Sequence, residues 1–169
     1  MKLPEAPRLR FATLKPADAP FILKLVNEPG WLQYVGDRNI HDLVAAAAYI
    51  SKGPAASHAE HGFGLDLVSL ADTSEPVGIC GLLQRDYLDA PDIGYAFSQA
   101  HAGRGFASEA AQAVVDHARQ ALGLQKLYAL TSPDNLASMR VLEKCGFVFL
   151  KLLQSPADKS PSRLFQIVL

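Results

Sequence analysis

The sequence predicts one α/β (α+β) domain with a mixed sheet of about seven strands and helices on both faces. The chain has 169 residues, a length that suits a single domain with a sizeable buried core. Hydrophobic residues make up 49% and charged residues 20%, as in ordinary globular proteins. Segments with the period of strands alternate with segments that have the spacing of helices, and no repeat or linker divides them. Residues 1–169 are therefore expected to form one domain.

The predicted strands are short runs in which apolar residues alternate with polar ones or follow one another directly. Leu9 and Phe11 alternate with Arg8 and Arg10, the pattern of a half-buried strand. Residues 126–131 are almost continuously apolar, which is typical of a strand buried on both faces. On these criteria strands are expected at residues 8–14, 62–70, 77–85, 92–98, 126–131, 147–152 and 163–169.

The predicted helices are recognised by apolar residues three or four positions apart and by the glycines and prolines that end them. They are expected at residues 18–28, 41–52, 106–122 and 135–145. Pro29-Gly30 is expected to end the first helix, so that residues 31–39 form a loop. Gly53-Pro54 is expected to stop the second helix.

Charge and composition argue against several classes of function. The net charge is −1 and the sequence pI is near 6.5, which gives no reason to expect binding to nucleic acid or to a membrane surface. The N-terminus lacks the apolar region of a secretion signal, and no apolar run approaches the ~18 residues of a membrane span. A cytoplasmic protein is expected.

The cysteines and histidines form no metal-binding motif. Cys80 and Cys145 lie far apart in the sequence and are expected to be reduced core residues rather than a disulfide. The histidines show no ligand spacing, so no metal cofactor is expected. They are expected to be solvated or to lie in loops: His41, His58, His61, His101 and His117.

A glycine-bearing loop, Gly103-Arg104-Gly105, lies between the fourth predicted strand and the longest predicted helix. The first amides of a helix have no partner inside it, and the helix dipole favours an anion there. The two glycines let an anion approach the main chain closely, and Arg104 adds a cation. The loop therefore predicts a pyrophosphate cradle, with a simple tight turn as the alternative. It matches neither a P-loop nor the G-x-G-x-x-G of dinucleotide-binding folds.

Residues 102–110 resemble the central motif of the GNAT superfamily, Q/R-x-x-G-x-G/A, which binds the pyrophosphate of acetyl-CoA. Gly105 and Ala107 match the last two fixed positions, whereas Ala102 stands where the motif has Gln or Arg. The form of the motif in this chain looks like that of the RimJ/RimL-type branch. The resemblance implies that acetyl-CoA contacts Gly103, Arg104, Gly105, Phe106 and Ala107.

Residues 134–147 resemble a second segment of the same branch, Asn-x-x-Ser-x-x-x-x-Glu-Lys-x-Gly-Phe, and the whole resemblance covers roughly residues 8 to 150. Asn135 and Ser138 are three positions apart, so they share one face of a helix. The pair could hydrogen-bond the pantetheine arm, and Ser138 could protonate the departing thiolate. The alternative for Asn135 is the N-cap of its helix.

The resemblance implies a GNAT fold with a mostly antiparallel sheet and an acyl-CoA N-acyltransferase activity. Such an enzyme moves an acetyl group from acetyl-CoA to a primary amine, either a protein N-terminus or a small molecule, by direct attack in a ternary complex. It would act as a monomer or homodimer. The alternative is a catalytically silent CoA-binding sensor or interaction module with the same fold.

In the superfamily the fourth strand splays from the fifth, and its free main chain holds the pantetheine and the thioester oxygen. Here this implies contacts from the main chain of Ala96, Phe97 and Ser98. Asp92 stands near the position where several family members keep a carboxylate base. An ordinary charge at a strand end is the alternative for Asp92.

The acceptor site of the resembling proteins is bordered by the loop that carries Trp31, Tyr34, Asp37 and Arg38 in this chain. Trp31 and Tyr34 are the expected substrate contacts. An aromatic and an acidic residue together suit a cationic amine. The alternative for Trp31 is that it packs the loop onto the sheet.

Overall fold

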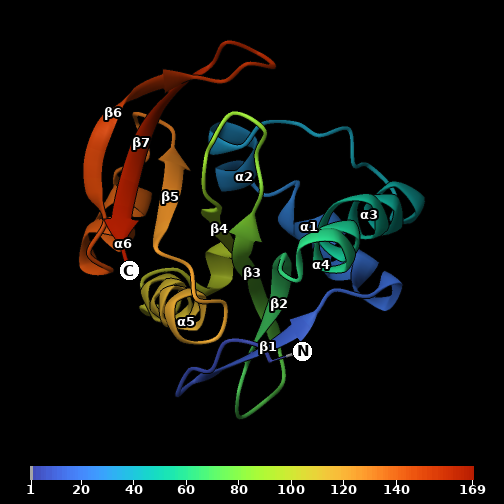
Figure 1. Cartoon of the computed structure of the whole chain (residues 1–169). Helices are drawn as coiled ribbons and strands as arrows, with labels where there is room; N and C mark the ends of the chain where they lie inside the picture. The colour runs from blue at the N-terminus through green and yellow to red at the C-terminus, as the bar shows by residue number, and fades with distance from the viewer. Residues whose placement is uncertain (1) are drawn as a thin grey trace.

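The computed structural model describes residues 2–169, which form one seven-stranded sheet in the order β1-β2-β3-β4-β5-β7-β6 (Figure 1). Only the pair β4–β5 is parallel, and all other neighbours are antiparallel. This confirms the prediction of a mixed, mostly antiparallel sheet. The strands are β1 Leu9–Thr13, β2 Leu65–Leu70, β3 Pro76–Leu83, β4 Asp92–Phe97, β5 Lys126–Thr131, β6 Val148–Gln154 and β7 Pro161–Val168.

Helices cover both faces of the sheet, as predicted. The α-helices are α1 Ala19–Leu25, α2 Pro29–Tyr34, α3 Leu43–Ile50, α4 Ala56–His61, α5 Phe106–Gln120 and α6 Leu136–Lys144. On one face, α1 and α3 pack in a core cluster with Leu65, Leu67 and Ile79. On the other, α5 and α6 pack in a cluster with Val68 and Cys80. Neighbouring residues of β2 and β3 thus enter opposite cores, because side chains alternate along a strand.

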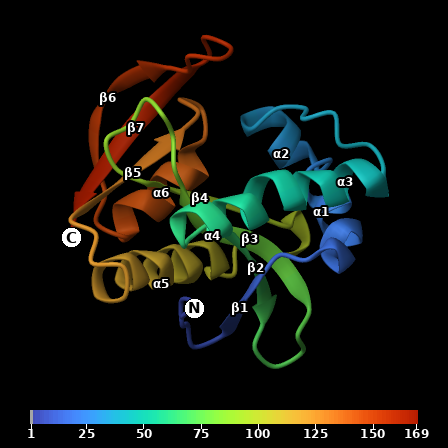
Figure 2. The same ribbon diagram turned by 45° about the vertical axis from the view of Figure 1, so that its right-hand side comes forward.

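Two predicted helix boundaries are wrong. Residues 31–39 are not all loop, because Pro29 begins α2 instead of ending the helix before it. Proline suits the first position of a helix, where its missing N–H would have had no partner. Gly53-Pro54 does not stop the second helix, because a π-helical turn, Ser51–Ala55, contains both residues and leads into α4. Figure 2 shows α3 and α4 following one another across the sheet.

The prediction for the cysteines agrees with the structure, and the prediction for two histidines does not. Cys80 and Cys145 are free thiols in the core. The side chains of His58 and His101 are only 9% and 10% exposed. His58 is buried because Asp66, on the inward face of β2, needs a polar partner: His58 Nε2 lies 2.8 Å from Asp66 Oδ1.

The two halves of the sheet separate between β4 and β5. These strands pair only at Asp92–Tyr128 and Ile93–Ala129. Beyond Ile93, β4 continues along β3 while β5 continues along β7. One edge of β4 therefore has no neighbouring strand from Gly94 onward, and this opening positions the site described next.

Candidate functional site

The glycine loop has the geometry that close approach of an anion requires. Gly103 and Gly105 have φ angles of +75° and +79°, a left-handed region that side chains rarely allow. A Cβ at Gly103 would meet no atom within 4 Å, so the space beside the main chain is open. Gly105 is the N-cap of α5 and gives no side-chain cap, which leaves the first amides of the helix available. The loop can thus bind a diphosphate through its main chain.

Arg8 lies beside this loop, a placement that the sequence did not predict. Its Nε donates to Glu109 Oε2 at 2.6 Å and its Nη1 to the Arg104 carbonyl at 3.1 Å. The guanidinium stands 4.7 Å from the ring centre of Phe106, and that of Arg104 stands 4.9 Å from it. Two guanidinium groups therefore flank the N-terminus of α5, and that of Arg8 is paired with Glu109. Arg8 is exposed, as the alternating pattern predicts, but its partners Glu109 and Arg104 are remote in the sequence, so its place beside the loop has no local signal.

The free edge of β4 exposes a different set of amides from the set that the resemblance implied. Ser98 N–H donates to the Val77 carbonyl at 2.8 Å. Because bonding direction alternates along an antiparallel ladder, Ala96 also directs its N–H toward β3. The N–H groups of Tyr95 and Phe97 point the other way, into the opening beside β5. Of Ala96, Phe97 and Ser98, only Phe97 offers an amide there, and Tyr95 is the donor that sequence reasoning missed.

Ser98 instead connects the end of β4 to the start of α2. Its buried hydroxyl donates to Glu28 Oε1 at 3.0 Å, and Gln99 N–H donates to Glu28 Oε2 at 2.9 Å. Glu28 is the N-cap residue of α2. This carboxylate therefore ties the start of α2 to the end of β4.

Asn135 and Ser138 lie together at the start of α6. Asn135 is the N-cap: its Oδ1 accepts a hydrogen bond from Ser138 N–H at 3.1 Å, which is the capping role held open by the sequence. The Ser138 hydroxyl lies 2.9 Å from the Tyr95 hydroxyl, which also donates to the Ser138 carbonyl at 3.1 Å. Burial raises the pKa of Tyr95, so its phenol stays protonated and holds the Ser138 side chain.

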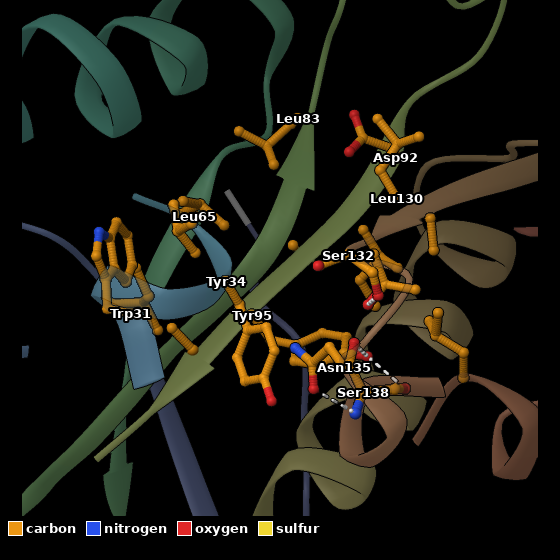
Figure 3. Close-up of a pocket in the computed structure, with 18 of the residues that line it drawn as sticks. Trp31, Tyr34, Leu65, Leu83, Asp92, Tyr95, Leu130, Ser132, Asn135 and Ser138 are labelled. Carbon is orange, nitrogen blue, oxygen red and sulfur yellow. Dashed lines mark hydrogen bonds between the residues drawn. The ribbon is translucent and has the colours of Figure 1, made fainter. Parts of the chain in front are cut away.

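A cavity of about 320 Å³ occupies the opening between β4 and β5. Figure 3 shows its residues converging from different elements: Trp31 and Tyr34 from α2, Tyr95 from β4, and Asn135 and Ser138 at α6. The cavity thus joins the free edge of β4 to the aromatic side chains of α2. A thioester lying along β4 would end in this space.

Asp92 lines the same cavity and is paired with an arginine. Arg85 Nε lies 2.9 Å from Oδ1 and 3.0 Å from Oδ2 of Asp92, whose side chain is only 2% exposed. Burial raises the pKa of Asp92 to about 6, against the opposing effect of the Arg85 charge. A carboxyl with this pKa can accept a proton near neutral pH. The partner Arg85 was not predicted.

Some residues of α2 and of the loop that follows it line the cavity, and others lie away from it. Trp31, Tyr34 and Arg38 line the cavity, and Trp31 also packs against the core cluster under α1 and α3. Asp37 is not among the lining residues. Its Oδ1 accepts from Asn39 N–H at 2.8 Å and lies 3.4 Å from His41 Nε2. The expected combination of an aromatic and an acid from this segment is therefore wrong: the charged group at the cavity is an arginine.

Two further searches cover residues 2–169. No group of three or more His, Cys, Asp or Glu side chains within this range could hold a metal ion. None of the helices in the same range has the length and apolar character that a membrane crossing requires.

Residues 8–148 match the family description of an acetyltransferase (GNAT) domain. YkkB of Bacillus subtilis (strain 168), an uncharacterized protein, is 37% identical over 99 residues, which are 56% of this chain and 58% of YkkB. YjcK of the same organism, a probable N-acetyltransferase, is 41% identical over 90 residues, 52% of this chain and 48% of YjcK. The chain thus spans about half the length of these curated relatives. YoaA, an uncharacterized N-acetyltransferase also from B. subtilis (strain 168), is 31% identical over 145 residues, 85% of this chain and 81% of YoaA.

Solved structures share the fold over nearly the whole chain. An acetyltransferase from Agrobacterium tumefaciens str. C58 superposes with a TM-score of 0.83 at 25% identity, covering 100% of this chain and 96% of that one. RimL, a ribosomal L7/L12 alpha-N-protein acetyltransferase in complex with coenzyme A, has a TM-score of 0.83 at 17% identity, over 98% and 97% of the two chains. At that identity the likeness to RimL is one of fold. The fold that the two sequence motifs implied is thereby confirmed.

Proposed function

The chain belongs to the GNAT acetyltransferase family, and from this premise we propose that residues 1–169 form one enzyme domain that acetylates a primary amine with acetyl-CoA. The observation that carries the proposal is the free edge of β4. This edge runs between the glycine loop before α5 and the cavity beside Ser138. The unpaired amides at the start of α5 suit a diphosphate, the free amides of β4 suit an extended pantetheine arm, and the cavity suits the thioester at its end.

Main-chain groups would make most of the contacts with acetyl-CoA. The amides that follow Gly105 would hold the diphosphate, with Arg104 adding positive charge and Arg8, which is paired with Glu109, adding N–H donors. The Phe97 main chain would bond the pantetheine, and Asn135 lies across the opening from it. The open space at Gly103 supports this fit, as does Gly105, where a Cβ would lie 3.5 Å from Arg8 Nη2 and a side chain would occupy the approach to the loop.

The transfer itself needs a base, an oxyanion donor and an acid. We assign the oxyanion donor to the Tyr95 amide, which points into the opening beside the cavity. Asp92, three positions earlier on β4, is about 10 Å away along the strand, so it would take the amine proton through a chain of water molecules. As the nitrogen–carbon bond forms and the carbon–sulfur bond breaks, Ser138, held in place by Tyr95, would give a proton to the thiolate and regain one from solvent.

The reaction needs no nucleophilic side chain, because the amine attacks the thioester directly in a ternary complex. Cys80 and Cys145 are both buried in the core and keep a structural role. Reduced core thiols also fit our proposal that the protein works in the cytoplasm. Acetyl-CoA and the amine are the partners that the proposal requires.

The test combines binding with turnover. Acetyl-CoA is expected to raise the melting temperature of the purified protein, and free thiol is expected to appear only when an amine from a chemical panel is added. A rise in melting temperature without thiol release on any amine would favour the silent CoA-binding module. Absence of any effect of acetyl-CoA on melting would contradict both functions.

A further inference from the structure

The cavity carries one positive charge, that of Arg38, which is paired with no carboxylate among residues 2–169. Its charged lining residues are Arg38, Arg85 and Asp92. Asp92 and Arg85 form a pair at 2.9 Å and cancel one another's charge. Within residues 2–169, Arg38 has no ion pair or side-chain hydrogen bond. The net charge of the lining is therefore positive.

The carboxylates near Arg38 in the sequence are engaged elsewhere. Asp37 bonds the Asn39 amide and lies beside His41. Glu28 holds Ser98 and Gln99, and Asp42 caps α3 through the Ala45 amide at 2.7 Å. None of these three carboxylates lines the cavity. A substrate that carries only ammonium groups would thus meet Arg38 without a free carboxylate to offset the repulsion.

Arg38 shares the cavity with aromatic side chains, among them Tyr49. Burial raises the pKa of the Tyr49 phenol, and the positive charge of Arg38 opposes that rise. Trp31, Tyr34 and Tyr95 line the same space. The acceptor that fits therefore carries, besides its amine, a negative group and an apolar or aromatic side chain.

We infer that the acceptor is a small amino carboxylate, an amine whose carboxylate is bound by Arg38 while its apolar or aromatic side chain packs against Trp31, Tyr34 and Tyr49. A guanidinium presents a planar fork of N–H donors that matches a carboxylate. The inference rests on the proposed function and narrows its substrate. It disfavours polyamines and other acceptors that carry only positive charge.

The kinetic test uses pairs of amines that differ only by a carboxylate: L-phenylalanine against phenethylamine, and L-leucine against 3-methylbutylamine. Each amino acid is expected to have the higher kcat/KM. Arg38→Gln should lower kcat/KM for the amino acids roughly 10-fold, the effect of one charge-assisted hydrogen bond, and leave the plain amines within about 2-fold. Arg119→Gln, on the exposed side of α5, is the matched control and should change neither. Equal losses for both members of a pair, or a preference for the plain amine or for spermidine, would overturn the inference.

A binding test keeps the result independent of turnover. In the presence of CoA, N-acetyl-L-phenylalanine should bind the wild-type protein at least 10-fold more tightly than N-acetylphenethylamine, and Arg38→Gln should remove most of the difference. Equal binding of the two compounds, or no binding of either, would show that the cavity does not select a carboxylate. Stabilisation by acetyl-CoA alone reports on the proposed function, so failure of the two proposals can be told apart.

Discussion

The part of the site proposed to hold acetyl-CoA and the part proposed to receive the amine are built in different ways. The first consists mainly of main-chain amides from the Gly103–Gly105 loop, the start of α5 and the edge of β4. The second consists of side chains, among them Trp31 and Arg38 from the segment around α2 and the pair formed by Asp92 and Arg85. A site made of main chain is sensitive to what fills its space, whereas a site made of side chains is sensitive to the charge and shape of each one.

Replacing Gly105 is expected to have the largest effect, confined to acetyl-CoA. Gly105→Glu puts a carboxylate at the proposed diphosphate position and should leave no measurable binding of acetyl-CoA by calorimetry. Gly105→Gln has the same size and the same backbone strain at a φ of +79°, so the difference between the two variants isolates charge.

Gly123→Glu is the second control for this prediction. Gly123 also has a positive φ, +64°, and open space around it, but it lies beyond the other end of α5. This variant should bind acetyl-CoA normally. Normal binding by Gly105→Glu would mean that the loop does not hold the diphosphate.

Asp92→Asn is expected to act on chemistry and to spare acetyl-CoA binding. Loss of a general base should lower kcat/KM for the amine roughly 100-fold. The base works when deprotonated, so with a pKa raised to about 6 the wild-type kcat/KM should rise with pH from 5 and level off above 7. The variant should lose this step in its pH profile.

Asp89→Asn is the matched control, since Asp89 is an exposed carboxylate that pairs with Lys126 at 2.8 Å just before β4. It should keep both the rate and the pH profile. If Asp92→Asn kept the pH profile of kcat/KM, Asp92 would be only a structural partner of Arg85. This is the strand-end role that the sequence also allowed.

Arg8→Ala is expected to weaken acetyl-CoA binding roughly 10-fold, the effect of one charged hydrogen-bond donor. Titration calorimetry of the variant against Arg10→Ala separates this effect from a general loss of positive charge. Arg10 is an exposed residue of β1, two positions further along the chain, and its side chain has no hydrogen bond or ion pair within residues 2–169. Equal affinities of the two variants for acetyl-CoA would show that Arg8 does not contribute to the diphosphate site.

Tyr95 lies where the acetyl-CoA part of the site meets the amine part, and Tyr95→Phe should have the smallest effect. It keeps the Tyr95 amide and removes the hydroxyl that holds Ser138, so kcat is expected to fall roughly 3-fold, by less than 1 kcal/mol, with acetyl-CoA affinity unchanged. Tyr128→Phe, which removes a buried hydroxyl bonded to Asp89 at 2.8 Å, is the control in steady-state kinetics. A drop in acetyl-CoA affinity in Tyr95→Phe would place this tyrosine in cofactor binding.

The elements that the sequence predicted well are those whose signal is local. β5 was predicted at its observed bounds because a strand covered on both faces is apolar throughout. The boundary at Gly53-Pro54 was missed because a π-helical turn accommodates these residues, and such a turn has no sequence pattern of its own. Asn135 was placed correctly at the start of α6, since capping depends on residues three positions apart.

Local sequence patterns predicted the glycine loop, the Asn135–Ser138 pair and the alternation of strands with helices, because each depends on backbone conformation and on neighbours a few residues away. The tertiary fold sets which amides of β4 are free, since that depends on the register of β4 with β3 and on where β5 turns away. It also decided that Arg8 flanks the loop, that Arg85 pairs with Asp92, and that Arg38 rather than Asp37 faces the cavity. The physical reason is that a charge is neutralised by whatever the fold brings near it, and the sequence order does not record those partners.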